Sequence, residues 1–308
     1  MDKLKSNNTK SALISSLSLI CILLLSSYFS SYISEYIKIG IRLCFGSIIG
    51  AVFPFMILTD LILATSSFEK ITSLRVGFER LFKINGYAVT AFIIGVVCGF
   101  PLGVKCARDL YDRGAITKEE CERLIGFSNN TGPAFIISGV GYAMRGSIKE
   151  GVILYLSMLL SAVLVGVLFG IKSVPSKKTI NQTHSAFDFA TSVRTAATGT
   201  INVCAFVTLF TVFAGGISLL FKNSLARLII ISFLEVGNAT SLLSSLPGSC
   251  IYSLPLSAFS ISFSGICVHF QAKSILLGCD VSMKKYYIMK LLQGIFAFFI
   301  SLLIMNLI

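Results

Sequence analysis

The stretch that decides the fold reads GFPLGVK, residues 99–105, and it closes an apolar run that begins at residue 87. Two glycines and a proline oppose a regular helix at this point, and a lysine follows them directly; these residues are Gly99, Pro101, Gly103 and Lys105. Such an interruption within a bilayer is tolerated only where protein or a water-filled cavity surrounds the freed backbone groups. The stretch therefore predicts that residues 87–104 form a re-entrant hairpin with a sharp turn at its end.

The composition of the whole chain indicates that lipid is its surrounding solvent. Hydrophobic residues make up 55% of the 308 positions and charged residues 13%, whereas a soluble globular chain carries about 25% charged residues. The net charge of +12 does not indicate a nucleic-acid partner, because the basic residues lie in short links between apolar runs. The nine cysteines form no C-x-x-C pair, so no metal site or redox cofactor is expected.

Nine apolar runs follow one another, near 11–33, 39–64, 87–104, 124–143, 150–171, 199–221, 228–246, 254–271 and 288–308. The first run is about 20 residues long, enough to span a bilayer, and no A-x-A cleavage site follows it. It therefore predicts a retained helix and not a signal peptide. Tyr286 and Tyr287 lie near the start of the last run, where we expect them to anchor it at the membrane interface.

Lys and Arg concentrate in four links: before the first run, after the second, in the centre of the chain and before the last run. Such links are typically cytoplasmic, so the N-terminus is predicted to be cytoplasmic too. All four links can lie on the cytoplasmic side of the membrane only if each half of the chain contains a re-entrant hairpin. The second hairpin is predicted within 228–271, where Glu235, Gly237 and Asn238 interrupt a run. The sequence thus predicts an all-α polytopic membrane protein with about 8–10 membrane segments.

We expect one membrane domain over residues 1–308, with halves at 11–171 and 199–308 and a cytoplasmic link at 172–198. Each half contains an apolar helix, then a broken element with glycine, then a helix interrupted by polar residues. Residues 127–141 and 259–271 both begin with Phe-Ser and carry a glycine in mid-run. This order predicts an inverted repeat with a site where the halves meet. A chance likeness between two apolar runs is the alternative.

The one strongly charged segment, residues 105–123, is predicted to form a helix, a tight turn and a second helix. Thr117 followed by Glu120 is a capping box, which opens a helix at about residue 118. Gly114 fits the end of the preceding helix.

Asn129, Asn130 and Thr131 precede a Gly-Pro pair inside an apolar run. Because proline lacks an N–H and disfavours helix in the residue before it, we expect the helix to unwind here. The freed carbonyls and the amide side chains would then face a ligand. An ordinary proline kink, with its amides bonded to neighbouring helices, is the alternative.

Glu235 is the ionisable residue that most strongly indicates function. A carboxylate at the centre of a span costs roughly 2.5–3.5 kcal/mol and is a functional candidate by default. A salt bridge to Lys105 or Arg108 that ties the two halves together is the alternative. Asp60 lies nearer the end of its run, where solvation explains it nearly as well as a site does. His269 is expected to be a hydrogen-bonded core residue.

Catalytic patterns are sparse, and we expect no enzyme. The sequence contains no H-E-x-x-H motif and no phosphate-binding loop of the G-x-x-x-x-G-K type. Ser264 and His269 are a conceivable Ser–His pair, yet their five-residue spacing does not bring them to one helix face. An intramembrane hydrolase is therefore the weakest alternative.

In their order, these motifs resemble the nucleoside-recognition (Gate) domain membrane proteins, in particular the YlbJ-type sporulation integral membrane proteins of spore-forming bacteria. The resemblance covers roughly residues 45–300, with the Gate motif at 99–141. The family carries a small Ala where this chain has Val104. The matching stretches are 53–55, 99–105, 123–125, 129–135, Glu235 with Gly237, and 263–265 with Gln271.

The resemblance implies a fold related to concentrative nucleoside transporters, in which two hairpins and two unwound helices enclose a midplane site. It also implies movement of a small solute during spore formation, with dipicolinic acid as the suggested cargo. We therefore predict a secondary transporter of a small polar or anionic solute, dipicolinate-like or nucleoside-like, in the cell membrane or a forespore membrane. The alternative is a non-transporting scaffold in spore or envelope assembly.

In the predicted site, Lys105 and the amides around Gly103 would hold a carboxylate. Asn129, Asn130 and Thr131 would hydrogen-bond the solute, and Glu235 would take a coupling cation, H⁺ or Na⁺. The other predicted substrate-binding residues are Gly99, Pro101, Asn238, Ser264 and Gln271. The expected partners are the small-molecule solute and the lipid bilayer, with no nucleic acid; the sequence is compatible with a homo-oligomer.

Overall fold

The computed structural model describes residues 16, 19–20, 23–24, 27–65, 72–178, 188–221, 224–247 and 250–307. Every regular element in these ranges is a helix, which confirms the predicted all-α class. Nearly half of the predicted first span at 11–33 lies outside the described residues.

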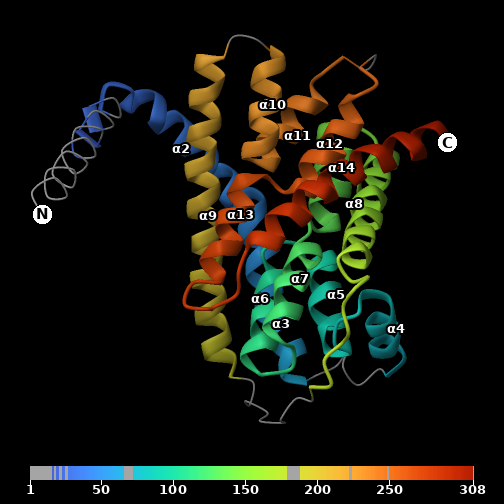
Figure 1. Cartoon of the computed structure of the whole chain (residues 1–308). Helices are drawn as coiled ribbons and strands as arrows, with labels where there is room; N and C mark the ends of the chain where they lie inside the picture. Colours follow the sequence, from blue (N-terminus) through green and yellow to red (C-terminus); the bar gives the residue numbers. More distant parts are fainter. Residues whose placement is uncertain are drawn as a thin grey trace, which may run out of the picture.

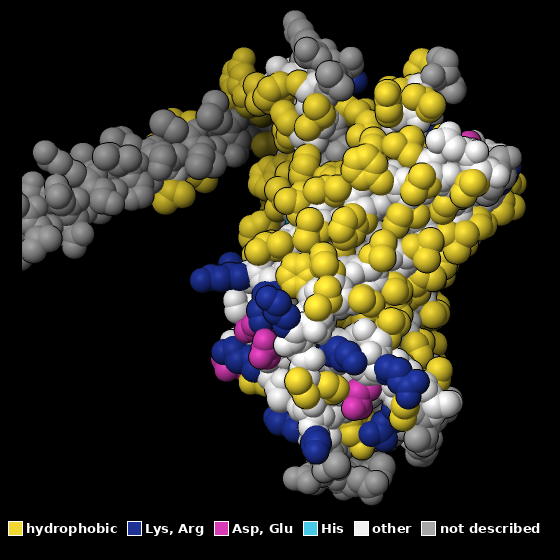
Figure 2. Space-filling view, turned by 45° about the vertical axis from the view of Figure 1, so that its right-hand side comes forward, with side chains coloured by type: hydrophobic (Ala, Val, Ile, Leu, Met, Phe, Trp, Pro, Cys, Tyr) yellow, Lys and Arg dark blue, Asp and Glu magenta, His cyan; other side chains and the backbone are white. Residues whose placement is uncertain are grey.

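Within the described ranges, four helical segments are long and apolar enough to cross a membrane. They are α8 (Ile148–Leu168), α9 (Phe189–Leu220), the pair Ser253–Ile275, and α14 (Lys284–Leu307). A bent pair, Ser73–Phe82 with Gly86–Val97, makes a fifth if it is counted as one span. Figure 2 shows hydrophobic side chains over most of the visible face and charged side chains gathered toward its lower end. The protein is therefore a polytopic membrane protein, as predicted.

The N-terminal helices run on without a break from α2 (Ser30–Leu43) through the π-helix η1 (Cys44–Ile48) into α3 (Ile49–Thr65). Both α2 and α3 pack along the long helix α9. The short elements α4 (Thr72–Phe82) and η2 (Gly86–Ala88) lead from there to the first hairpin.

A hairpin is present at the predicted place, and it consists of α5 (Val89–Val97) and α6 (Leu102–Asp112). The predicted bounds of 87–104 are too short, because the predicted end turn is the tip of the hairpin and the first predicted helix of the charged segment is part of its second arm. The two helices pack on each other, and residues 98–101 form the tip between them. Gly114, with a φ of 72°, follows the end of α6. The next helix, α7 (Lys118–Ser128), begins with the predicted capping box, in which Thr117 and Glu120 bond to each other's backbone N–H.

The helix that follows is broken where the Asn-Asn-Thr-Gly-Pro sequence lies. Residues 129–132 are not helical, and the chain resumes as η3 (Ala134–Met144), a π-helix of 11 residues. The sequence did not predict this π-helix. η3 then packs against α8.

The second half repeats this order of elements. α10 (Ser224–Leu234) and α11 (Val236–Ser244) pack on each other and meet at Glu235, which forms the tip of the second hairpin. α12 (Ser253–Phe263) and α13 (Gly265–Ile275) form a broken helix that meets at Ser264, and α14 follows. Each half therefore contains a hairpin, a broken helix and a long helix. In Figure 1 the first hairpin lies in the lower part of the molecule and the second in the upper part.

Candidate functional site

The tip of the first hairpin packs directly on the break between α7 and η3, and glycines make this close approach possible. A Cβ on Gly103 would lie 2.7 Å from the carbonyl carbon of Ser128, and one on Gly99 would lie 2.7 Å from the backbone nitrogen of Gly132. Pro101, which is buried, precedes α6 at the tip. The structure thus brings the two predicted polar stretches, 99–103 and 129–132, into contact.

The three polar residues of the break are buried and point in different directions. The Asn130 side-chain amide donates to the Phe127 carbonyl at 2.7 Å, which closes the end of α7. The Thr131 hydroxyl donates to the Ile261 carbonyl on α12 at 3.2 Å. A hydrogen bond therefore joins the first break to the second broken helix, one turn before that helix breaks at Ser264.

A polar face of α14 covers the first break, and the sequence analysis missed it. Tyr286, Lys290 and Gln293 are fully buried on α14 and lie on one helix face at spacings of four and three. Asn129 donates from its side-chain amide to the Tyr286 hydroxyl at 3.0 Å. The prediction that Tyr286 anchors a membrane interface is wrong, because its ring is 0% exposed and lies among helices. The available signal was a lysine one turn after Tyr286, inside the last apolar run.

Lys290 has a buried amino group whose hydrogen-bond partners are neutral. Its Nζ donates to the Asn129 carbonyl and to the Gln293 side-chain oxygen, each at 2.8 Å. Gln293 in turn donates to the Asn130 side-chain oxygen at 2.8 Å. In the described part of the chain, no carboxylate lies within ion-pair distance of Lys290. Buried charges are normally paired, so this geometry favours an anion beside the lysine.

Several buried polar atoms around this region have no hydrogen-bond partner among the described residues. They are the side-chain oxygens of Ser128, Asn129, Ser262 and Gln271 and both ring nitrogens of His269. An unsatisfied buried polar atom costs about 1–3 kcal/mol, so such atoms suit a polar ligand.

His269 is buried but not in the way that the sequence predicts. Its ring packs edge to face against Phe263, Tyr286 and Tyr287, with centroids 4.8, 5.2 and 5.7 Å away. The expectation of a hydrogen-bonded core histidine is wrong, since neither ring nitrogen bonds to a described residue. The Ser264 hydroxyl lies 3.3 Å from the Ile261 carbonyl, to which it donates.

Glu235 forms the tip of the second hairpin and caps its second helix. Its carboxylate accepts hydrogen bonds from the backbone nitrogens of Gly237 (2.9 Å) and Asn238 (2.7 Å) and from the Asn238 side-chain amide (2.8 Å). In the described residues no ion pair joins Glu235 to Lys105 or Arg108, so the salt-bridge alternative is wrong.

The second tip packs on the second break as the first tip packs on the first. Gly265 has a φ of 67°, and a Cβ on it would lie 3.1 Å from the Leu234 carbonyl oxygen. It would also lie 3.3 Å from the Cα of Glu235. Gln271, six residues further along α13, donates to the Cys267 sulfur at 3.4 Å. Both halves therefore place a hairpin tip against a helix break through a glycine contact.

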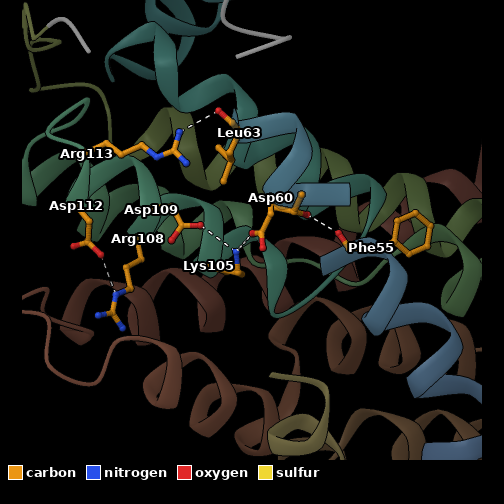
Figure 3. A network of polar contacts seen from close by, with 9 residues as sticks. Phe55, Asp60, Leu63, Lys105, Arg108, Asp109, Asp112 and Arg113 are labelled. Carbon is orange, nitrogen blue, oxygen red and sulfur yellow. Dashed lines mark hydrogen bonds and ion pairs between the residues drawn. The ribbon is translucent and has the colours of Figure 1, made fainter. Parts of the chain in front are cut away.

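Lys105 lies two residues after Gly103 on α6 but does not face the break with a free ammonium. It forms ion pairs with Asp60 on α3 and with Asp109 on its own helix, the latter at 3.2 Å (Figure 3). Arg108 pairs with Asp112 at 3.3 Å and donates to the Ile275 carbonyl on α13. Asp60 is thus a partner in an ion-pair cluster and not simply a solvated helix end.

A large apolar groove lies elsewhere, between α2, η1 and α9. It has a volume of about 1510 Å³ and includes none of the predicted site residues. Its apolar lining suits lipid chains and offers little to a polar solute.

The chain is similar to the sporulation integral membrane protein YlbJ of Bacillus subtilis (strain 168). The two are 23% identical over 303 aligned residues, which cover 84% of this chain and 74% of the relative. No family model matches the chain, and no solved structure matches it. The resemblance to YlbJ-type sporulation membrane proteins that the motif order predicts is thereby confirmed, while the Gate-domain assignment stays a prediction.

Proposed function

We propose that this chain is a secondary transporter of a small anionic solute and that it works in a membrane of a sporulating cell. The observation that carries the proposal is Lys290, whose fully buried amino group donates to two neutral oxygens beside an unwound segment. The name of the similar YlbJ protein supports the link to sporulation.

The charge of Lys290 favours an anion over a neutral nucleoside. Placing a lysine at the centre of a span costs roughly 2.5–3.5 kcal/mol, which is an upper value for Lys290 in the second turn of α14. A carboxylate about 4 Å from the ammonium would contribute about 4 kcal/mol at an effective dielectric constant of 20. The bound solute would therefore offset the cost of burying the lysine. A small carboxylate such as dipicolinate fits this requirement.

The uncharged polar groups of the site would orient the solute. The side-chain oxygen of Asn129 has no described partner, and its amide already binds Tyr286. Asn130 is held by Gln293, and Thr131 by α12, so these side chains are fixed before the solute arrives. A site whose groups are fixed in advance loses less entropy when a ligand binds.

The two glycine contacts provide a basis for alternating access. In transporters with inverted repeats, one group of helices moves against another around a midplane site. Here each hairpin tip covers one helix break through backbone contacts at Gly99, Gly103 and Gly265. Separation of one tip from its break would expose the site to one side while the other tip keeps the opposite side closed.

Uptake of labelled dipicolinate into proteoliposomes tests the proposal. Lys290→Gln should lower the initial rate at least tenfold, because the anion loses its counter-charge. Lys273→Gln is the matched control, since Lys273 is exposed on α13 and should tolerate the change. A rate for Lys290→Gln equal to that of the unmodified protein would contradict the proposal. A protein that moves no solute but copurifies with envelope proteins would instead support the scaffold alternative.

A further inference from the structure

An ion-pair cluster joins the first hairpin to the N-terminal helices, and the site described above does not use it. Figure 3 shows Lys105 between Asp60 of α3 and Asp109 of α6. The side chains of Lys105, Asp60 and Asp109 are only 13%, 19% and 30% exposed, respectively. We refer to Asp60, Lys105 and Asp109 as the Asp–Lys–Asp cluster.

The cluster contains one carboxylate more than it contains ammonium groups. Two carboxylates that share one cation repel each other, and such an arrangement favours the binding of one proton. The neighbouring cations do not pair with these carboxylates. Arg108 binds Asp112 and the Ile275 carbonyl, and Arg113, which is exposed, donates to the Leu63 carbonyl at 3.0 Å.

Other charged groups near α6 have partners of their own or face away. α5 carries no charged residue, and Lys273 on α13 is exposed. On α7, Glu120 accepts from the Asn85 and Ser176 backbones, and Arg123 donates to the Lys83 carbonyl at 3.1 Å. Arg194 on α9, which packs on α3, is exposed. The remaining charges of α7 pair as Lys118–Asp280, Lys285–Glu119 and Lys285–Glu122.

The position of the cluster couples its charge to the hairpin. α3 packs chiefly on α9, whereas α6 packs chiefly on α5 and α7. The bond between Asp60 and Lys105 therefore adds an ionic link where α3 and α6 pack on each other. Lys105 lies two residues after Gly103, the residue that touches the first break, and therefore on nearly the opposite face of α6. Loss of this bond would release the hairpin whose tip covers the site.

We infer that the Asp–Lys–Asp cluster is the proton-coupling site of the transporter, an inference that rests on the proposed function. One proton from the aqueous phase adds to one carboxylate oxygen of the pair, which makes the cluster neutral and weakens a bond to Lys105. The same proton leaves to the other side when the hairpin has moved. A metal cation is disfavoured here, because the ammonium already occupies the position between the two carboxylates.

The test measures the response of solute accumulation to a pH gradient in proteoliposomes clamped at zero membrane potential. For one proton per solute, a tenfold proton gradient should change the steady-state accumulation by up to about tenfold. Asp60→Asn and Asp109→Asn should lose this response but retain solute exchange. Asp112→Asn is the matched control on the same helix, and it should respond like the unmodified protein. Asp60→Glu keeps a carboxylate and should retain the response.

A gradient response that persists in both Asp60→Asn and Asp109→Asn would overturn the inference while leaving the transporter proposal intact. If the unmodified protein moves no solute, the proposed function fails, and infrared spectroscopy then decides the proton site alone. Acidification should produce a carboxylic-acid carbonyl band in the unmodified protein and in Asp112→Asn. The band should be missing in at least one of the two variants, Asp60→Asn and Asp109→Asn. Its presence at full strength in both variants would overturn the inference.

Discussion

Replacement of Gly103 by alanine is the sharpest test of how the hairpin tip meets the helix break. A Cβ at this position would overlap the Ser128 carbonyl and would lie 2.7 Å from its carbon and 3.2 Å from the Asn129 nitrogen. These are backbone atoms, so no side-chain rotation can relieve the overlap. The tip or the broken helix must shift instead.

The cost of this shift can be set from the structure. Overpacking in a well-packed interior lowers the free energy of unfolding by about 1–3 kcal/mol. Because a Cβ at Gly103 would meet backbone atoms of a buried element, we expect Gly103→Ala to lose about 3 kcal/mol. For a chain of 308 residues, an unfolding entropy of about 2.1 cal/mol/K per residue converts this loss into a fall in Tm of roughly 5 °C. Because the tip covers the candidate site, solute uptake should fall as well.

Thermal unfolding of the purified protein in nanodiscs, followed by uptake assays, measures both effects. Gly77→Ala is the matched control: Gly77 lies on α4, and a Cβ there would meet no heavy atom within 4 Å. It should raise stability by about 0.5–1 kcal/mol, as alanine does in a helix interior. If Gly103→Ala unfolds at the same temperature as the unmodified protein and transports at the same rate, the close approach of tip and break is refuted.

Two further predictions concern carboxylates. Glu235→Gln should abolish transport while the protein still folds and inserts, with a loss of about 1 kcal/mol from the weaker cap of α11; uptake at the unmodified rate would remove Glu235 from the mechanism. Asp280, in the link between α13 and α14, accepts hydrogen bonds from Lys118 and Tyr111, and these lower its pKa. The stability that its carboxylate contributes is therefore present above the unfolded pKa of about 3.9 and is lost as the pH falls through the lower folded value. Asp280→Asn should unfold at a lower temperature than the unmodified protein near neutral pH, and the difference in Tm should close only in strong acid.

Lys105 and Lys290 have different hydrogen-bond partners, which indicates different roles for the two lysines. The sequence offered Lys105 as the residue that holds an anion, because it follows the hairpin tip directly. Its ammonium is bound by two carboxylates, whereas the ammonium of Lys290 has neutral partners. We therefore propose Lys290 for the solute and Lys105 for coupling. Substitutions at the two positions should differ, with affinity lost at Lys290 and the gradient response lost at Lys105.

The sequence by itself determined the class of the protein and the places where its helices break. Low charge content required lipid as solvent. The breaks lie where Gly99 adopts a φ of 89° that favours glycine and where Pro101 and Pro133 lack a backbone N–H. The capping box at Thr117 was readable for the same reason, since a cap involves residues only three positions apart. Helix breaks and caps depend on residues that are close together in the chain, so they can be predicted from the sequence.

Only the tertiary structure decided what faces the breaks. Tyr286, Lys290 and Gln293 meet Asn129 and Asn130 across 157 to 163 positions of chain, and Asp60 meets Lys105 across 45. Which face of α14 turns inward depends on how it packs between α8 and α12, and apolar helices without a clear polar face leave that rotation undetermined. The candidate site is therefore a product of helix packing, because a buried charge gains its partners only when distant helices are brought together.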